Sequence, residues 1–372
     1  MWIKQIMKIL IGVCGIGYGH STRQLELAKK LIQRGHEVRV LTHDKGHEIF
    51  DNRYCSYDIW IPFISYKNGK LNIIDIIKKN FDKFIIGFLK DFSVFIELNK
   101  DKFIPDIIIS DYDPISARFS YIWNKPLFIV DQQSKFQYFN FEDINGYSCL
   151  EEKKRLNLFF PKFSKKFITS FYKLPSLNHK NVEIVGSIIR SDLLNELNKN
   201  KKKINDKVTI LVYFSEYGGR GIAQKFNSII EEFLKIDSCI KIIIYTNKRM
   251  KNIKTNGKEI IFKKENRESF IRDMIKSDFI LSTAGHTLIS ESLYLGKPLY
   301  VIPLGTFDQH YCGRFIEENK LGISDYKINS RTLNVFIKNI KSYELNIENC
   351  KNLLVKEKAI DKIINYIEEF NG

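Results

Sequence analysis

The chain has 372 residues, of which 44% are hydrophobic and 13% aromatic, so it is long enough for two globular domains that each bury a core. Its 59 Lys and Arg residues against 43 acidic residues give a formal charge of +16, which favours anionic partners such as nucleic acid or lipid headgroups, although a composition rich in Lys, Ile and Asn explains the charge equally well. No apolar run approaches the roughly 20 residues that cross a bilayer, and the N-terminus lacks a cleavable signal pattern, so we expect a cytoplasmic protein.

The cysteines are spaced singly, without a C-x-x-C pair: Cys14, Cys55, Cys149, Cys239, Cys312 and Cys350. This spacing is not typical of a zinc site or of a disulfide framework. We therefore expect reduced thiols and no bound metal.

A glycine turn near the N-terminus is the first candidate site. Apolar residues predict a strand over Lys8 to Val13, and helical spacing predicts a helix from Thr22 to Arg34. The turn between them holds four residues that a ligand can approach closely: Gly15, Gly17, Tyr18 and Gly19. Its spacing, G-x-G-x-G-H, differs from the G-x-G-x-x-G of dinucleotide folds, which disfavours a nicotinamide site.

His20 follows this turn at the carboxyl edge of the first strand, where ligands of open α/β sheets bind. Imidazole titrates near neutrality, so His20 is the candidate general base, with simple hydrogen bonding of the loop as the alternative. Asp111 ends a second strand on the same edge and is the candidate partner of the imidazole. Asp113 and Asp131 compete for that role, and Asp113 is also the expected N-cap of a helix that starts at Pro114.

The segment from Leu71 to Lys102 has a helical period and is rich in Phe and Ile. Its apolar residues recur at spacings of three and four: Ile73, Ile74, Ile77, Phe81, Phe84, Ile85, Phe88 and Phe92. We expect this face to be buried against a sheet. The alternative is an interfacial membrane contact in which exposed Phe side chains act with neighbouring lysines, Lys78, Lys79, Lys83 and Lys90.

The second half contains a phosphate-binding pattern. Segment 277–312 reads as strand, turn, helix, strand, turn, helix, and the first turn consists of small or polar residues around Gly285, His286 and Thr287. A helix N-terminus offers free N–H groups and a partial positive charge, so this turn is a candidate diphosphate site. Glu291 lies one turn further along the same helix face, where a carboxylate could accept the hydroxyls of a ribose.

The combination of Thr283-Ala284-Gly285-His286-Thr287, Glu291, Gly296-Lys297-Pro298 and Asp308-Gln309 resembles the donor-binding half of GT-B glycosyltransferases. The branch it resembles includes the bacterial lipid-intermediate N-acetylglucosaminyltransferases and the UDP-sugar transferases. Four motifs in the right order within about 35 residues are a specific signal.

The resemblance implies an α/β protein with two Rossmann-like domains that face each other across a cleft. Residues 1–185 would bind the acceptor and residues 186–352 the nucleotide sugar, and a helix within 353–372 would pack back on the first domain. Asp308 and Gln309 would read the sugar of the donor. Arg190 matches the family's basic residue at the start of the second domain and would help the helix N-terminus to bind phosphate.

The implied activity is inverting and metal-independent transfer of a sugar from a nucleotide diphosphate donor, a UDP-sugar, to a hydroxyl of a glycan or lipid-linked acceptor. His20 would be the base and Asp111 its partner, without a cofactor. Relatives that use lipid-linked acceptors carry a hydrophobic and basic patch in the N-terminal half, which implies peripheral contact with the anionic inner face of the membrane. No nucleic acid is expected as a partner.

Several alternatives stay open at this point. The loop Ser215-Glu216-Tyr217-Gly218-Gly219 departs from the family's Gly-Gly-Ser type of turn, and Glu216 would repel a phosphate. Arg190 could be a surface charge beside Asp192, and the pattern at Thr287, Glu291 and Asp308 could consist of helix caps and a solvated carboxylate. A sugar-nucleotide 2-epimerase of the same fold and a non-catalytic binder of polyanions or nucleic acid are the competing functions.

Overall fold

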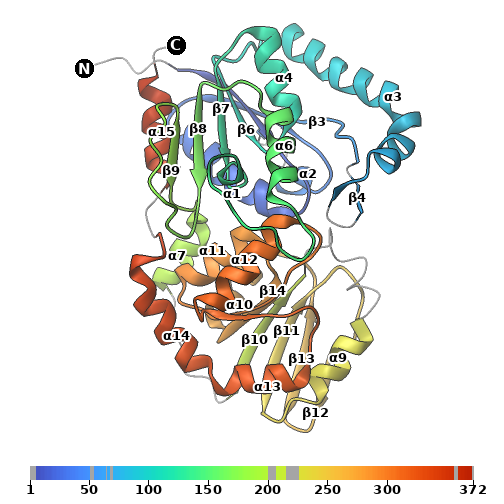
Figure 1. Cartoon of the computed structure of the whole chain (residues 1–372), viewed down its shortest axis with the longest axis vertical. Helices are drawn as coiled ribbons and strands as arrows, with labels where there is room; N and C mark the ends of the chain where they lie inside the picture. Colours follow the sequence, from blue (N-terminus) through green and yellow to red (C-terminus); the bar gives the residue numbers. More distant parts are fainter. Residues whose placement is uncertain are drawn as a thin grey trace. The chain divides into compact units, whose positions relative to one another are not determined.

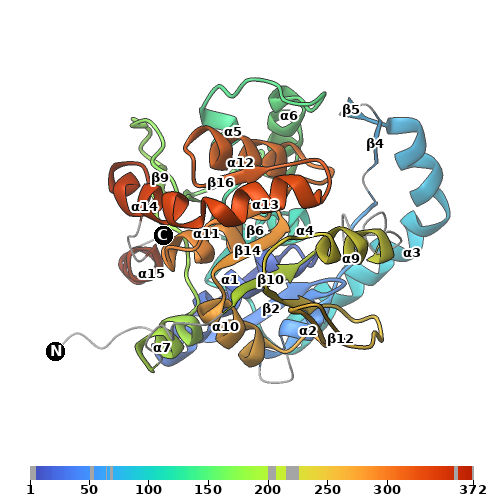
Figure 2. The ribbon, with the colours of Figure 1, turned by 90° about the horizontal axis from the view of Figure 1, so that it is seen from below.

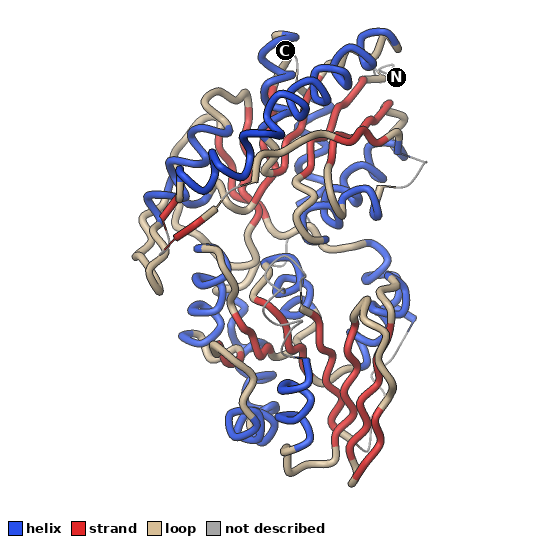
Figure 3. Tube along the Cα trace, turned by 90° about the vertical axis from the view of Figure 1, so that its right-hand side faces the viewer, coloured by secondary structure: helices blue, strands red, loops and turns tan. Residues whose placement is uncertain are grey.

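Figure 1 shows a computed structural model of the chain, in which the structure describes residues 6–50, 54–63, 65–67, 70–199, 207–214, 226–355 and 359–370. The chain forms two compact units. The first runs to Ile188 and resumes at Glu357, and the second runs from Ile189 to Lys356. The sequence places these boundaries after residues 185 and 352. In each unit the strands lie side by side with helices alongside them (Figure 3).

A seven-stranded parallel sheet forms the first unit, in the order β3-β2-β1-β6-β7-β8-β9. Its strands are β1 (Lys8–Val13), β2 (Glu37–Thr42), β3 (Ser56–Asp58), β6 (Ile107–Asp111), β7 (Leu127–Asp131), β8 (Lys165–Thr169) and β9 (Val182–Val185). Its helices are α1 (Tyr18–Gln33), α2 (Gly46–Ile49), α3 (Ile73–Lys100), α4 (Pro114–Trp123), α5 (Lys135–Tyr138), α6 (Cys149–Phe159) and α15 (Ala359–Glu369), and β4 (Tyr66–Lys67) pairs with β5 (Lys70–Leu71). The central strands β6, β7 and β8 are buried along their whole length, as strands of a parallel sheet covered on both faces are expected to be.

The strand order of this sheet reverses at β1. From β1 the chain first adds β2 and β3 on one side, and it then adds β6 and the later strands on the other. Ligands of open α/β sheets bind at such a switch point, beyond the carboxyl ends of the strands. The residues that follow β1 and β6 are therefore the ones placed to meet a ligand.

Helix α1 begins at Tyr18, earlier than the predicted start at Thr22. Gly17 has φ 70°, a left-handed conformation that costs glycine little, and it reverses the chain directly into the helix. His20 consequently lies in the first turn of α1 rather than in a loop before it.

The expected burial of the apolar face of α3 is wrong. This face, defined by Ile73, Ile74, Ile77, Phe81, Phe84, Ile85, Phe88 and Phe92, has side chains that are between 49% and 81% exposed. The buried residues of α3 are instead Asn80, Gly87, Asp91, Val94 and Leu98. Figures 1 and 2 show the helix at the edge of the first unit, with its N-terminal end beside the β4–β5 strands.

A small and polar stripe attaches α3 to the segment after β3. Asn80 accepts from the backbone N–H of Phe63 at 2.7 Å and donates to its carbonyl at 2.8 Å. The Trp60 N–H donates to Asp91 Oδ1 at 2.7 Å, and a Cβ on Gly87 would lie 2.1 Å from the Trp60 ring. The apolar face is exposed because this stripe, and not the face, makes the contact with the fold.

The second unit contains a second seven-stranded sheet, in the order β12-β13-β11-β10-β14-β15-β16. Its strands are β10 (Val208–Tyr213), β11 (Ile240–Tyr245), β12 (Ile253–Thr255), β13 (Lys258–Lys263), β14 (Phe279–Thr283), β15 (Leu299–Ile302) and β16 (Gly322–Ser324). Its helices are α7 (Ser191–Lys199), α9 (Phe226–Leu234), α10 (Arg267–Lys276), α11 (His286–Tyr294), α12 (Phe307–Glu318), α13 (Ser330–Lys338) and α14 (Ile340–Asn349), followed by the 3₁₀ turn η2 (Cys350–Asn352). Only the edge strand β12 pairs antiparallel among the described strands of this sheet. The order reverses at β10, so the turn after β14 lies at a switch point.

Helix α15 packs on the first unit although it follows the second one in sequence. Ala359, Ile363, Ile364 and Ile367 are buried in the same core cluster as Phe128. Charged groups at its margin also hold it, since Glu368 pairs with Arg34 at 3.2 Å. The apolar face of this short helix is therefore part of the core of the first unit.

Candidate active site

The glycine turn is held by a histidine from the next strand end. The backbone N–H of Gly15 donates to His43 Nε2 at 3.0 Å, and His43 Nδ1 lies 2.9 Å from Asp44 Oδ2. A Cβ at Gly15 would lie 1.6 Å from the His43 carbonyl oxygen, so only glycine fits there. Gly17, Tyr18 and Gly19 are half-buried, which leaves part of the glycine turn accessible on the acceptor side that the resemblance implies.

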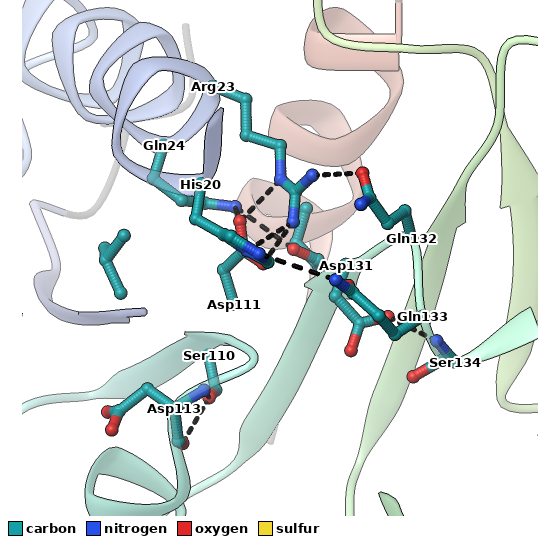
Figure 4. Close-up of polar contacts among 12 residues, drawn as sticks. His20, Arg23, Gln24, Ser110, Asp111, Asp113, Asp131, Gln132, Gln133 and Ser134 are labelled. Carbon is teal, nitrogen blue, oxygen red and sulfur yellow. Dashed lines mark hydrogen bonds and ion pairs between the residues drawn. The ribbon is translucent and has the colours of Figure 1, made fainter. Parts of the chain in front are cut away.

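His20 meets Asp111 across the switch point between β1 and β6. His20 Nδ1 lies 2.8 Å from Asp111 Oδ1, as Figure 4 shows. The other two candidates have different tasks: Asp113 caps α4 by accepting from Ser116 N–H at 2.9 Å, and Asp131 Oδ1 accepts from Ser134 N–H at 2.9 Å. Of the three carboxylates, Asp111 is therefore the one that contacts the His20 ring.

Asp111 is fully buried and ionised. Its carboxylate accepts from Arg23 Nε at 2.6 Å and from Gln24 Nε2 at 2.9 Å, and Arg23 Nη2 contacts the other oxygen. Burial opposes ionisation, but the positive charge of Arg23 and the contact with His20 outweigh it and lower the pKa of Asp111 to about 2. The site therefore holds a permanent negative charge beside the imidazole, matched by a permanent positive charge.

The residues that surround this pair are not predicted from the sequence. Arg23 is three positions after His20 in α1, and its Nη1 donates to Gln132 Oε1 at 2.6 Å. Gln133 brings its side-chain nitrogen to 3.4 Å from His20 Nε2. The signal that could have found Arg23 is its spacing, because a residue three after His20 lies on the same helix face.

A strained aromatic residue completes the surroundings of the imidazole. The ring of Tyr112 stacks on that of His20, with centroids 5.8 Å apart and planes inclined by 26°. Tyr112 has φ 57°, which is uncommon for a bulky residue, and its hydroxyl donates to Glu152 Oε1 at 2.9 Å. Such strain is held in place by surrounding contacts and is often found at functional sites.

In the second unit, Arg190 and Glu291 bind each other. Arg190 Nε and Nη2 donate to the two oxygens of Glu291, both at 2.6 Å, and the two side chains are buried. The alternative of Arg190 as a surface charge is wrong, because Arg190 is buried and pairs with Glu291. The alternative of a solvated Glu291 is wrong as well: burial raises the pKa of its carboxyl, and Arg190 opposes that effect.

The turn before α11 is open. Gly285 is the N-cap of the helix, and a Cβ at this position would have no described atom within 4 Å. His286 is buried in the first helical turn, where its carbonyl accepts from Ser290 Oγ at 2.7 Å, and Thr287 is half-buried beside it. Among the described residues, the space beside Gly285 at this helix N-terminus is therefore accessible, as a phosphate site requires.

The turn before α12 is capped by Thr306 and not by Asp308. Thr306 is the N-cap and accepts from Gln309 N–H at 3.4 Å, so Asp308 is not the cap. Gln309 Oε1 accepts from Leu304 N–H at 2.8 Å, which closes the loop, and Asp308 is buried in the first turn of α12. Lys297 of the Gly-Lys-Pro motif is a structural residue, since its ammonium group donates to the Ser277 carbonyl.

The departing loop Ser215-Glu216-Tyr217-Gly218-Gly219 lies outside the described residues. Within the described ranges, no three His, Cys, Asp or Glu side chains are grouped as a metal site. Within those same ranges, no helix combines the length and the apolar character needed to cross a bilayer.

Comparisons with known proteins agree with this architecture. The chain is 26% identical to the UDP-N-acetylglucosamine--N-acetylmuramyl-(pentapeptide) pyrophosphoryl-undecaprenol N-acetylglucosamine transferase of Rickettsia canadensis, over 98% of this chain and 99% of that protein. Its fold is similar to that of the glycotransferase of kitacinnamycin, with a TM-score of 0.68 and 13% identity over 98% of this chain and 99% of that one. It is also similar to Acinetobacter baumannii MurG, with a TM-score of 0.58 and 12% identity over 98% of this chain and 100% of that one.

These likenesses confirm the predicted GT-B fold. The family described as glycosyl transferase family 1 matches residues 7–341, which include both sheets, the His20–Asp111 pair and the turn before α11. The chain belongs to this glycosyltransferase family.

Proposed function

We propose that this glycosyltransferase transfers a sugar from a UDP-sugar to a hydroxyl of a glycan or lipid-linked acceptor, with inversion and without a metal. The observation that carries the proposal is the 2.8 Å contact of His20 with an ionised Asp111 at the switch point of the first sheet. The substrate class is supported by the name of the Rickettsia canadensis relative, which specifies UDP-N-acetylglucosamine and a pyrophosphoryl-undecaprenol acceptor.

The reaction is a single displacement in this proposal. His20 Nε2 takes the proton of the acceptor hydroxyl while its oxygen forms a bond to the anomeric carbon. The bond from that carbon to the diphosphate breaks, and the nucleoside diphosphate leaves with the electron pair. Attack from the side opposite the leaving group inverts the anomeric configuration.

The donor would be bound by the second unit. The N-terminus of α11, with Gly285, His286 and Thr287, would stabilise the negative charge that grows on the leaving diphosphate. Each oxygen of Glu291 has a second lone pair beyond the one that Arg190 uses, and these remain suited to ribose hydroxyls. Asp308 and Gln309 would read the sugar.

The proposal includes peripheral contact with the anionic inner face of the cytoplasmic membrane through α3. Its apolar face is exposed, and lysines border it: Lys78, Lys79 and Lys83 are exposed, while Lys90 is half-buried and paired with Asp58. Apolar side chains inserted between headgroups, with lysines near the phosphates, are the pattern of an interfacial helix. The enzyme would then bind a lipid-linked acceptor at the membrane that carries this acceptor.

Incubation of the purified chain with UDP-N-acetylglucosamine, other nucleotide sugars and a polyprenyl-pyrophosphoryl acceptor tests the function. We expect one sugar to be transferred with an inverted anomeric bond, seen by NMR of the product, at a rate that EDTA leaves unchanged. His20→Ala should keep donor binding by calorimetry and lose transfer by about 10²- to 10⁴-fold.

Three results would contradict parts of the proposal. A changed UDP-sugar released from the donor alone would identify a 2-epimerase. Transfer that EDTA abolishes would exclude the metal-independent mechanism. Undiminished transfer by His20→Ala would exclude His20 as the base.

A further inference from the structure

The contacts of His20 Nδ1 make conflicting demands. Asp111 Oδ1 lies 2.8 Å from this nitrogen, and Arg23 Nη2 lies 2.7 Å from it. A carboxylate only accepts hydrogen bonds, so Asp111 requires a proton on Nδ1. A guanidinium only donates, so Arg23 requires Nδ1 without a proton. A neutral imidazole can satisfy only one of the two.

The choice at Nδ1 determines the state of the other ring nitrogen. With the proton on Nδ1, the lone pair of Nε2 is available and the ring can act as a base. With Arg23 donating to Nδ1, the proton lies on Nε2 and the ring cannot take another from a hydroxyl. The side-chain nitrogen of Gln133, 3.4 Å from Nε2, favours the first state, as Asp111 does.

Arg23 is held rigidly enough to compete with Asp111 for His20 Nδ1. Its side chain is 3% exposed, its Nε donates to Asp111 Oδ2 at 2.6 Å, and its Nη1 donates to Gln132 Oε1 at 2.6 Å. These two anchors hold the guanidinium on either side, so Nη2 cannot leave the space between Asp111 and His20 without breaking one of them (Figure 4).

We propose that Arg23 is a positioning residue that decides which ring nitrogen of His20 carries the proton. In the resting protein both tautomers of the ring are populated. Asp111 stabilises the Nδ1–H tautomer, and Arg23 stabilises the Nε2–H tautomer. The inference rests on the proposed role of His20 as the base, because only then does the tautomer control readiness for transfer.

The test uses the full chain with ¹⁵N-labelled histidine and long-range ¹H–¹⁵N spectra of the imidazole nitrogens. The chain has seven histidines, and His20→Asn identifies the signals of His20. We expect intermediate nitrogen shifts in the wild type, and a move towards the limiting values of the Nδ1–H tautomer in Arg23→Gln. A wild-type ring already wholly in the Nδ1–H form, or unchanged shifts in a folded Arg23→Gln, would overturn the proposal.

A lysine variant tests whether the geometry of the guanidinium, and not only its positive charge, sets the tautomer. Arg23→Lys keeps a buried cation beside Asp111 but lacks the planar fork whose separate nitrogens contact Asp111 and His20 Nδ1, so its spectrum should match that of Arg23→Gln. Wild-type shifts in the lysine variant would overturn the proposal. This variant also serves if Arg23→Gln does not fold, since it leaves no buried charge unpaired.

Gln24→Met is the matched control. It removes the 2.9 Å bond to Asp111 Oδ2 without touching the imidazole, and it should leave the His20 shifts as they are. A move as large as that of Arg23→Gln would mean that any loss at Asp111 shifts the tautomer, which would overturn the specific role of Arg23. These spectra report on the ring whether or not the chain transfers sugar, whereas transfer by His20→Ala tests the proposed function alone.

Discussion

Helices α3 and α15 have the same kind of sequence and opposite surroundings. Both repeat apolar residues at spacings of three and four, and both belong to the first unit. In α15 the apolar residues Ile363, Ile364 and Ile367 are buried, whereas in α3 the apolar face from Ile73 to Phe92 is exposed and the small and polar stripe is buried. Periodicity therefore predicts a helix with an apolar face, but it does not tell what covers that face.

The largest expected effect is on stability, where the two helices should differ most. Ile363→Ala removes a fully buried side chain and should lower the free energy of unfolding by about 2–5 kcal/mol. Ile85→Ala, at a side chain that is 71% exposed, should change it by less than about 0.5 kcal/mol. Urea unfolding followed by circular dichroism measures both, and equal losses would show that α3 is covered in solution.

The membrane contact should depend on α3 and not on α15. Phe81→Asp with Phe88→Asp removes two exposed rings of the apolar face, each worth about 1.5–3 kcal/mol when buried, so vesicle binding should fall by at least about 100-fold. Co-sedimentation with phosphatidylglycerol vesicles measures this effect. Asp361→Asn on the exposed side of α15 is the control and should leave binding unchanged. Undiminished binding by the double variant would exclude α3 as the contact.

The stability of the contact between α3 and Trp60 should depend on the small size of Gly87. Gly87→Ala places a methyl group 2.1 Å from the Trp60 ring, and relief of this overlap should cost about 1–3 kcal/mol. Phe88→Ala, one position away on the exposed side, is the matched control and should cost less than about 0.5 kcal/mol. Thermal unfolding compares the two, and a neutral Gly87→Ala would show that Trp60 does not pack on α3.

The smallest effect concerns the pH dependence of that attachment. Burial raises the pKa of Asp91 to about 6, although the Trp60 N–H lowers it. Because the pKa in the folded state is above that of the unfolded chain, the stability that Asp91 contributes is complete at low pH and is lost as the pH rises through about 6. Two pKa units correspond to about 3 kcal/mol, which solvent near the carboxyl screens to about 1 kcal/mol, and Asp91→Asn should remove this pH dependence. Melting temperatures at pH values below and above 6 check it, and parallel curves for both proteins would exclude the effect.

Much of the fold and part of the site follow from the sequence by itself. Apolar runs and turn residues determine the two α/β units, and the position of His20 and Asp111 after neighbouring strands brings them to one sheet edge. Gly285 before an amphipathic helix likewise determines an open helix N-terminus. These features depend on local geometry, which a short stretch of chain encodes.

Only the tertiary structure decided which polar groups meet. It selected Asp111 over Asp113 and Asp131, placed Arg23 between Asp111 and His20, paired Arg190 with Glu291, and left the apolar face of α3 exposed. The reason is physical: a buried charge must find a partner wherever the packed chain offers one, and that partner is often distant in sequence, as Arg190 and Glu291 are 101 residues apart. Spacing along the chain does not contain that information.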